Sequence, residues 1–98
     1  MKDNPAQIIF HKRATVALDA LSLEDRKSLL KAINHLAIFG IDSVIGKDVK
    51  KIKVDESLYL LKVNPGFRII FRLTDRDEIE ILDIVMKERL ELFTASQS

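Results

Sequence analysis

The feature that most constrains the fold is a pair of alternating apolar segments, residues 58–63 and 67–73, on either side of Asn64-Pro65-Gly66. In both segments the apolar side chains recur at every second position, which is typical of a strand with one buried face. Asn, Pro and Gly favour turns. We therefore predict two antiparallel strands joined as a hairpin. The stretch also contains three cations: Lys62, Arg68 and Arg72.

Alternation assigns these cations to the sheet face that points away from the core, because successive side chains of a strand point to opposite faces. The large apolar residues of the second segment occupy odd positions and must face the core. Arg68 and Arg72 occupy even positions and are predicted on the open face. The same reasoning places Lys62 on the open face. The predicted core residues of the two strands are Tyr59, Leu61, Val63, Phe67, Ile69, Phe71 and Leu73.

A third strand is predicted over residues 78–85, after the turn Asp75-Arg76-Asp77. Alternation places Leu82 and Ile84 in the core here. The outward-facing residues of this strand are then Ile81, Asp83, Val85 and Lys87. These three strands form an antiparallel meander.

Two helices are predicted before the meander. Residues 6–10 form a short apolar strand, and a first helix follows within residues 11–21. The second helix covers residues 23–38, with Ser22 as its N-cap, acids in its first turn and Gly40 at its end. The lysine-rich segment after it reads as a loop with a short helical turn or an extended edge.

The predicted class is α+β: an N-terminal strand, a helical hairpin and a three-stranded antiparallel meander, with the helices packed on one sheet face. Residues 1–93 form a single domain, and residues 94–98 form a flexible tail. The 98 residues include no cysteine, which excludes disulfides and thiolate metal sites. No apolar run approaches the length of a bilayer span, and no secretory signal begins the chain. We expect a cytoplasmic protein with no membrane partner.

Charge is unevenly distributed although the formal net charge is only +1. Residues 47–72 contain seven Lys or Arg and three Asp or Glu, and residues 73–93 contain three and seven. This asymmetry favours either a basic groove or salt bridges between strands. In the second case Arg68 and Arg72 pair across the sheet with Asp83 and Glu80.

The order of these motifs resembles that of the RelE/ParE superfamily of toxins from toxin–antitoxin pairs. A lysine-rich segment, residues 50–53, precedes the strand that begins at Tyr59, and Gly66-Phe67-Arg68 opens the next strand. A hydrophobic strand, residues 79–85, is followed by a basic segment that ends at Phe93. The resemblance covers nearly the whole chain.

The resemblance implies the toxin of a type II toxin–antitoxin system, a RelE-like ribosome-dependent mRNA endoribonuclease that inhibits translation. In such enzymes the RNA 2′-hydroxyl attacks the phosphate, so the protein needs a base, an acid and cations but neither metal nor cofactor. Arg68 then stabilises the phosphate and Lys62 is the candidate base. Lys87 and Arg89 complete the implied catalytic set. The implied RNA-binding residues are Lys50, Lys51, Lys53, Arg72 and Phe93.

Three positions depart from the RelE pattern. Phe93 stands where RelE has a tyrosine, Lys87 where many nucleolytic members have arginine, and Leu60 where RelE has a second lysine. Phenylalanine can stack on a base but cannot transfer a proton. These departures fit two alternatives: a ParE-like inhibitor of DNA gyrase without nuclease activity, or a degenerate homologue that retains antitoxin binding.

The implied partners are a cognate antitoxin together with the ribosome and mRNA, or DNA gyrase in the first alternative. His11 and His35 are expected to lie far from the open sheet face and to have no catalytic role.

Overall fold

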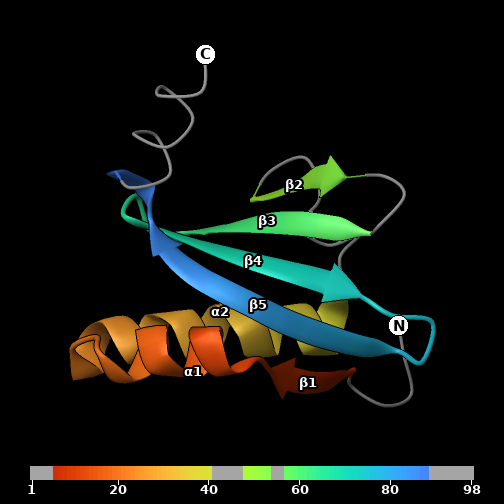
Figure 1. Ribbon diagram of the computed structural model, residues 1–98, viewed down its shortest axis with the longest axis horizontal. Helices are drawn as coiled ribbons and strands as arrows, with labels where there is room; N and C mark the ends of the chain where they lie inside the picture. The colour runs from red at the N-terminus through yellow and green to blue at the C-terminus, as the bar shows by residue number, and fades with distance from the viewer. Residues whose placement is uncertain (1–5, 41–47, 54–56, 89–98) are drawn as a thin grey trace.

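A computed structural model of the protein describes residues 6–40, 48–53 and 57–88. These residues form two helices and one five-stranded sheet (Figure 1). In chain order the elements are β1 (Gln7–Phe10), α1 (Lys12–Asp19), α2 (Leu23–Phe39), β2 (Val49–Lys53), β3 (Leu58–Val63), β4 (Phe67–Leu73) and β5 (Glu78–Met86). The predicted α+β class, helical hairpin and three-stranded meander are confirmed. The predicted tail, residues 94–98, lies outside the described residues.

The strand order across the sheet is β1-β5-β4-β3-β2. Strands β3, β4 and β5 form the antiparallel meander, and β2 pairs antiparallel with β3 at one edge. The lysine-rich segment, predicted as a loop or an extended edge, is therefore an edge strand. At the other edge β1 pairs parallel with the first half of β5, from Gln7 opposite Glu78 to Phe10 opposite Ile81.

The helical hairpin is fixed by local signals at the junction of α1 and α2. The Ser22 hydroxyl accepts a hydrogen bond from the Asp25 N–H at 3.2 Å and caps α2. The Arg26 side chain donates to the carbonyl oxygens of Leu18 and Leu21 at 3.3 Å each, at the end of α1. Gly40 ends α2 with a φ of 80°, a conformation that glycine adopts without steric cost.

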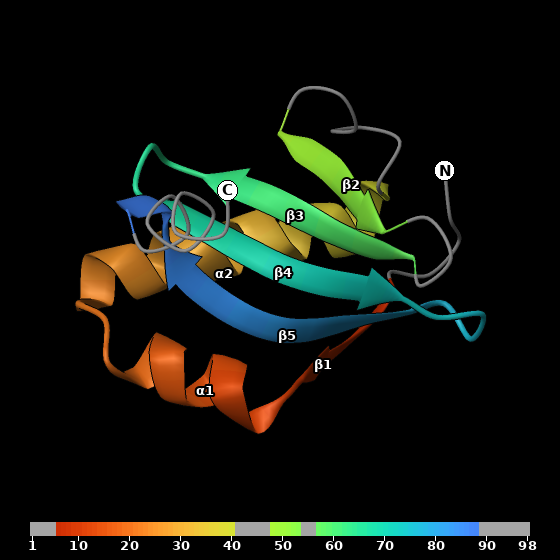
Figure 2. The same cartoon turned by 45° about the horizontal axis from the view of Figure 1, so that its top comes forward.

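The helices differ in where they pack. Helix α2 lies behind the sheet, whereas α1 runs along the edge beyond β5 (Figures 1 and 2). Neither helix of the described chain covers the sheet face opposite α2, which we call the open face. Neither helix in the described part of the chain is long and apolar enough to cross a bilayer.

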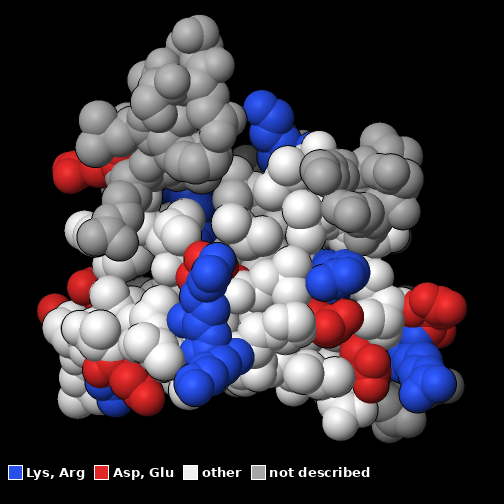
Figure 3. All heavy atoms as spheres, viewed as in Figure 1, with Lys and Arg blue, Asp and Glu red and all other residues white. Residues whose placement is uncertain are grey.

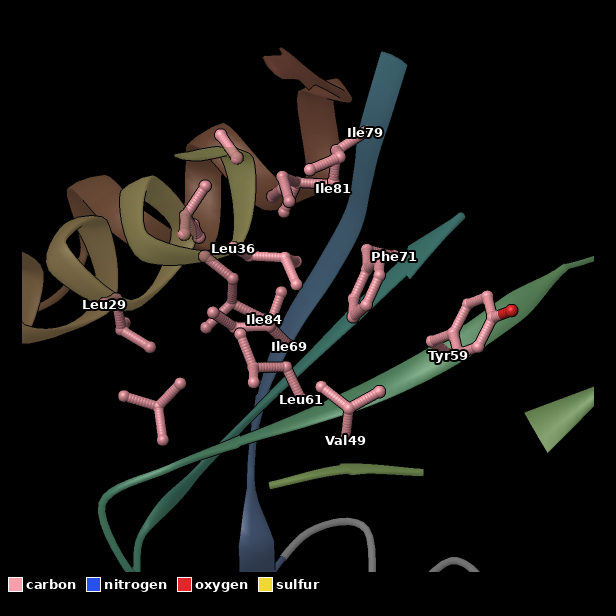
Figure 4. Close-up of a cluster of buried hydrophobic side chains, with 14 of the residues drawn as sticks. Leu29, Leu36, Val49, Tyr59, Leu61, Ile69, Phe71, Ile79, Ile81 and Ile84 are labelled. Atoms are coloured by element: carbon pink, nitrogen blue, oxygen red, sulfur yellow. The ribbon is translucent and has the colours of Figure 1, made fainter. Parts of the chain in front are cut away.

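The core lies between α2 and the sheet, where side chains from both layers point toward one another (Figure 4). Phe71 and Ile69 of β4 are fully buried, and the Phe71 ring stacks on Tyr59 with the ring centroids 5.4 Å apart. The predicted core positions on β3 and the middle of β4 are confirmed. Phe67 and Leu73 are half-buried and pack against the same cluster.

One prediction for β5 is wrong. Ile81, expected to face outward, has an exposed fraction of 0%, and Leu82, expected in the core, is half-buried and outside the core cluster. Phe71 pairs with Ile81 and the adjacent Ile70 pairs with Asp83, so Leu82 is an extra residue in β5. This is a β-bulge, which shifts the alternation by one position. Beyond it Ile84 is buried, as predicted.

Candidate functional site

Three of the four predicted catalytic residues, Lys62, Arg68 and Lys87, line one open pocket of about 360 Å³. We call it the hairpin pocket because it lies where β3 turns into β4. Lys62 of β3 pairs directly with Arg68 of β4. Lys87 follows β5, and its backbone N–H donates to the Gly66 carbonyl oxygen at 2.9 Å. The remaining lining residues are Asp48, Asn64 and Pro65.

The Arg68 guanidinium is held by the turn beside it. Its Nη1 donates to the carbonyl oxygen of Phe67 at 2.8 Å and to that of Pro65 at 3.4 Å. Arg68 forms no ion pair with any described residue. A guanidinium has five N–H donors in a planar fork, so the other donors are left for an oxyanion.

Asp48 is a pocket residue that sequence reasoning missed. It directly precedes β2, and its carbonyl oxygen accepts a hydrogen bond from the Lys62 N–H at 2.7 Å. A single acid within a lysine-rich segment is typical of solvated surface, so the sequence gives no reason to predict a function for the Asp48 side chain. Only the strand register reveals it, because the pairing of Val49 with Leu61 places Asp48 beside Lys62.

The predicted RNA-binding lysines of β2 are distributed over both faces. Lys50 is exposed and pairs with Leu60, which belongs to the open face. Lys51 pairs with Tyr59, and its Nζ lies 5.4 Å from the centroid of that ring on the core side of the sheet. The Lys53 side chain, Arg89 and Phe93 lie outside the described residues.

A second group of charges lies where α1 meets the sheet. Glu80 Oε2 lies within hydrogen-bond distance of His11 Nε2, at 2.8 Å, and Glu80 Oε1 lies 3.8 Å from Arg72 Nε. Asp83 Oδ2 lies 3.9 Å from Arg13 Nη1. We call this group the β5 charge cluster; its members are His11, Arg13, Arg72, Glu80 and Asp83.

This cluster decides between the two interpretations of the strand arginines. Arg72 lies beside Glu80, as the salt-bridge interpretation predicts, and its Nε is buried without a hydrogen-bond partner. Asp83 contacts Arg13 of α1 instead of Arg68. The prediction that His11 lies far from the open face is wrong, because α1 runs along the β5 edge. His35 stays on α2, with its ring centroid 4.6 Å from that of Phe39.

Figure 3 looks onto the open face and shows basic and acidic side chains interspersed on it, separated by uncharged surface. Among the residues that the structure describes, this face is therefore not a continuous basic groove. The half-buried pair Leu60 and Ile70 belongs to its uncharged part. Within residues 6–40, 48–53 and 57–88, no three His, Asp or Glu side chains come together in a way that could hold a metal ion.

Solved structures with the same fold include several RelE toxins. A chain of the archaeal RelE–RelB complex from Pyrococcus horikoshii has a TM-score of 0.70 and 22% identity, over 87% of this chain and 98% of that chain. The isolated RelE toxin of E. coli has a TM-score of 0.67 and 18% identity, over 93% and 94%. A chain of the YoeB–YefM complex from Staphylococcus aureus has a TM-score of 0.52 and 20% identity, over 80% and 92%.

These likenesses establish that the chain has the RelE fold, as the sequence resemblance predicts. No protein-family model and no curated protein matches the sequence.

Proposed function

We propose that the protein is the toxin of a type II toxin–antitoxin pair and cleaves mRNA on the ribosome as a RelE-like endoribonuclease. The observation that carries this proposal is the convergence of Lys62, Arg68 and Lys87 in the hairpin pocket of a RelE fold. The proposal places the protein in the cytoplasm, where ribosomes are found.

The chemistry requires little from the protein beyond charge and proton transfer. The RNA 2′-oxygen attacks the adjacent phosphorus, the bond to the 5′-oxygen breaks, and the products carry a 2′,3′-cyclic phosphate and a 5′-hydroxyl. Negative charge develops on the phosphate oxygens, and fixed cations stabilise that charge. Arg68 is suited to this role because its guanidinium is already held by two carbonyl oxygens. Lys62 on β3 and Lys87 just after β5 line the same pocket from the two sides of β4.

The experiment is cleavage of a synthetic mRNA bound to ribosomes, followed by primer extension. The full chain is expected to give discrete cuts in the A-site codon, and Arg68→Ala is expected to abolish both the cuts and the growth arrest. Arg76→Ala is the matched control, because Arg76 is an exposed arginine in the turn at the other end of β4. A folded Arg68→Ala variant that cuts like the wild type would contradict the assignment.

The same assay includes the gyrase alternative as an outcome. Intact mRNA, together with cleaved DNA trapped on gyrase, would replace the nuclease with a ParE-like inhibitor. A well-folded protein with neither activity, and no effect on growth, would identify a homologue that retains only antitoxin binding.

We also propose a cognate antitoxin as partner. The support is the likeness to chains solved in RelE–RelB and YoeB–YefM complexes. Co-expression with the product of the adjacent reading frame is expected to restore growth and to give a complex that survives gel filtration. Growth arrest that persists, with no complex, would count against that partner.

A further inference from the structure

Asp48 is the one acidic side chain among the described residues that line the hairpin pocket. The backbone fixes its position, because the Lys62 N–H donates to the Asp48 carbonyl oxygen immediately before β2 begins. Its carboxylate forms no ion pair or hydrogen bond with any described residue. Asp48 therefore lines the pocket from a backbone position that is fixed, and its carboxylate is not used in a contact with another described residue.

A carboxylate at this place opposes phosphate binding, since like charges repel. A pocket that served only to attract RNA would bind more tightly without it. The proposed reaction offers Asp48 a role other than phosphate binding, that of the general base. The reaction needs a base that is free of its proton at neutral pH.

Lysine and aspartate differ in how well they meet that need. Aspartate side chains are ordinarily ionised at neutral pH, and lysine side chains are ordinarily protonated. A lysine becomes a base when burial or neighbouring cations remove its proton. Lys62 is exposed, so burial does not provide this here, and a role as base would depend on the neighbouring cations Arg68 and Lys87 alone.

We propose that Asp48, and not Lys62, is the general base for the 2′-hydroxyl, an assignment that rests on the proposed function. The Asp48 carboxylate takes the 2′-hydroxyl proton while the bond from the 2′-oxygen to phosphorus forms. The bond from phosphorus to the 5′-oxygen breaks, and that oxygen takes a proton from the Lys87 ammonium. The Asp48 proton then passes to solvent, and Lys87 regains one from solvent. Lys62 and Arg68 hold the phosphate charge throughout.

The test compares Asp48→Asn, Asp48→Glu and Lys62→Met in single-turnover cleavage of ribosome-bound mRNA. Loss of a general base lowers the rate by about 10²–10⁴-fold, and we expect this loss for Asp48→Asn. Asp48→Glu should keep a large part of the rate. Binding of an RNA with a 2′-deoxy nucleotide at the cut site should be unchanged or tighter in Asp48→Asn, since a repulsive charge is gone. An asparagine that disrupted only the fold would weaken that binding.

The pH profile separates the two candidate bases. With a carboxylate as base, the wild-type rate falls as the pH is lowered, because a protonated carboxyl group cannot accept the 2′-hydroxyl proton. This acid limb should persist in Lys62→Met, a comparison that holds even if Asp48→Asn folds poorly. Wild-type cleavage by Asp48→Asn, or an acid limb missing from Lys62→Met, would overturn the assignment and leave the nuclease function in place. Absence of cleavage by the wild-type chain would overturn the proposed function itself.

Discussion

The hairpin pocket and the β5 charge cluster lie on the same sheet face and use charge in different ways. In the β5 charge cluster both carboxylates, Glu80 and Asp83, have a basic neighbour within 4 Å: His11, the N-cap of α1, lies beside Glu80, and Arg13 of α1 lies beside Asp83. In the hairpin pocket Lys62 and Arg68 form no ion pair with any described residue. Paired charges join α1 to the sheet, whereas charges without a protein partner remain able to bind a ligand.

The bulge at Leu82 makes this division possible. Glu80 and Asp83 are three residues apart, so strict alternation would place them on opposite faces. The extra residue restores both to the open face, where they pair with Arg72 and Ile70 of β4 in the strand register. Both carboxylates can then meet residues of α1.

The largest expected effect tests this bulge. Ile81→Asp should destabilise the fold by more than about 4 kcal/mol, because it buries an unpaired carboxylate in the core. Leu82→Asp should cost about 1 kcal/mol, a typical value for a substitution outside the core. Urea unfolding measures both free energies. A larger cost for Leu82→Asp than for Ile81→Asp would mean that β5 alternates without a bulge, and the comparison of the two regions would lose its basis.

A smaller effect is expected within the β5 charge cluster. Glu80→Gln should destabilise the fold by about 1 kcal/mol, since it weakens a charge-assisted contact with His11 and removes the charge beside Arg72. Cleavage of mRNA should be unchanged. Glu88→Gln is the matched control, because Glu88 is exposed, and its unfolding free energy should equal that of the wild type. A Glu80→Gln variant that lost cleavage at full stability would extend the active site to the cluster.

The smallest effect is expected at the rim of the same cluster. The Arg13 side chain is 80% exposed and lies 3.9 Å from Asp83, so solvent screens this pair. Arg13→Ala should change the unfolding free energy by no more than about 0.5 kcal/mol, as for most exposed ion pairs. The thermal unfolding midpoint measures this change. A larger loss of stability would show that the pair of Arg13 and Asp83 contributes more to the fold than its exposure and its distance indicate.

Much of the fold could be predicted because its signals are local. Ser22 and Gly40 fix the ends of α2, and the alternation of residues 67–73 fixes the core face of β4. The parallel pairing of β1 with β5 could not be predicted, since no local pattern specifies which distant strand an isolated apolar segment joins. The bulge left a weak trace in the sequence: the alternation of Ile79 and Ile81 is interrupted by Leu82, which directly follows Ile81.

The candidate site was predicted in part for a similar reason. Lys62 and Arg68 are placed by alternation within one hairpin, and the register brings them together. Asp48 is positioned at the pocket by the hydrogen bond that its carbonyl oxygen accepts from the Lys62 N–H. Composition and periodicity do not reveal this contact. Arg72 has the same position in the alternation as Arg68, and only the position of Glu80 distinguishes their surroundings.

The most direct test of the central claim compares these two arginines of β4. Arg68→Ala and Arg72→Ala remove the same side chain from the same face, four residues apart. In single-turnover cleavage of ribosome-bound mRNA, Arg68→Ala should lower the rate by about 10²–10³-fold, as loss of a fixed charge-stabilising donor does. Arg72→Ala should cause a far smaller loss, because Glu80 already offsets its charge. Equal losses, or a larger loss for Arg72→Ala, would contradict the claim that the hairpin pocket is the catalytic site.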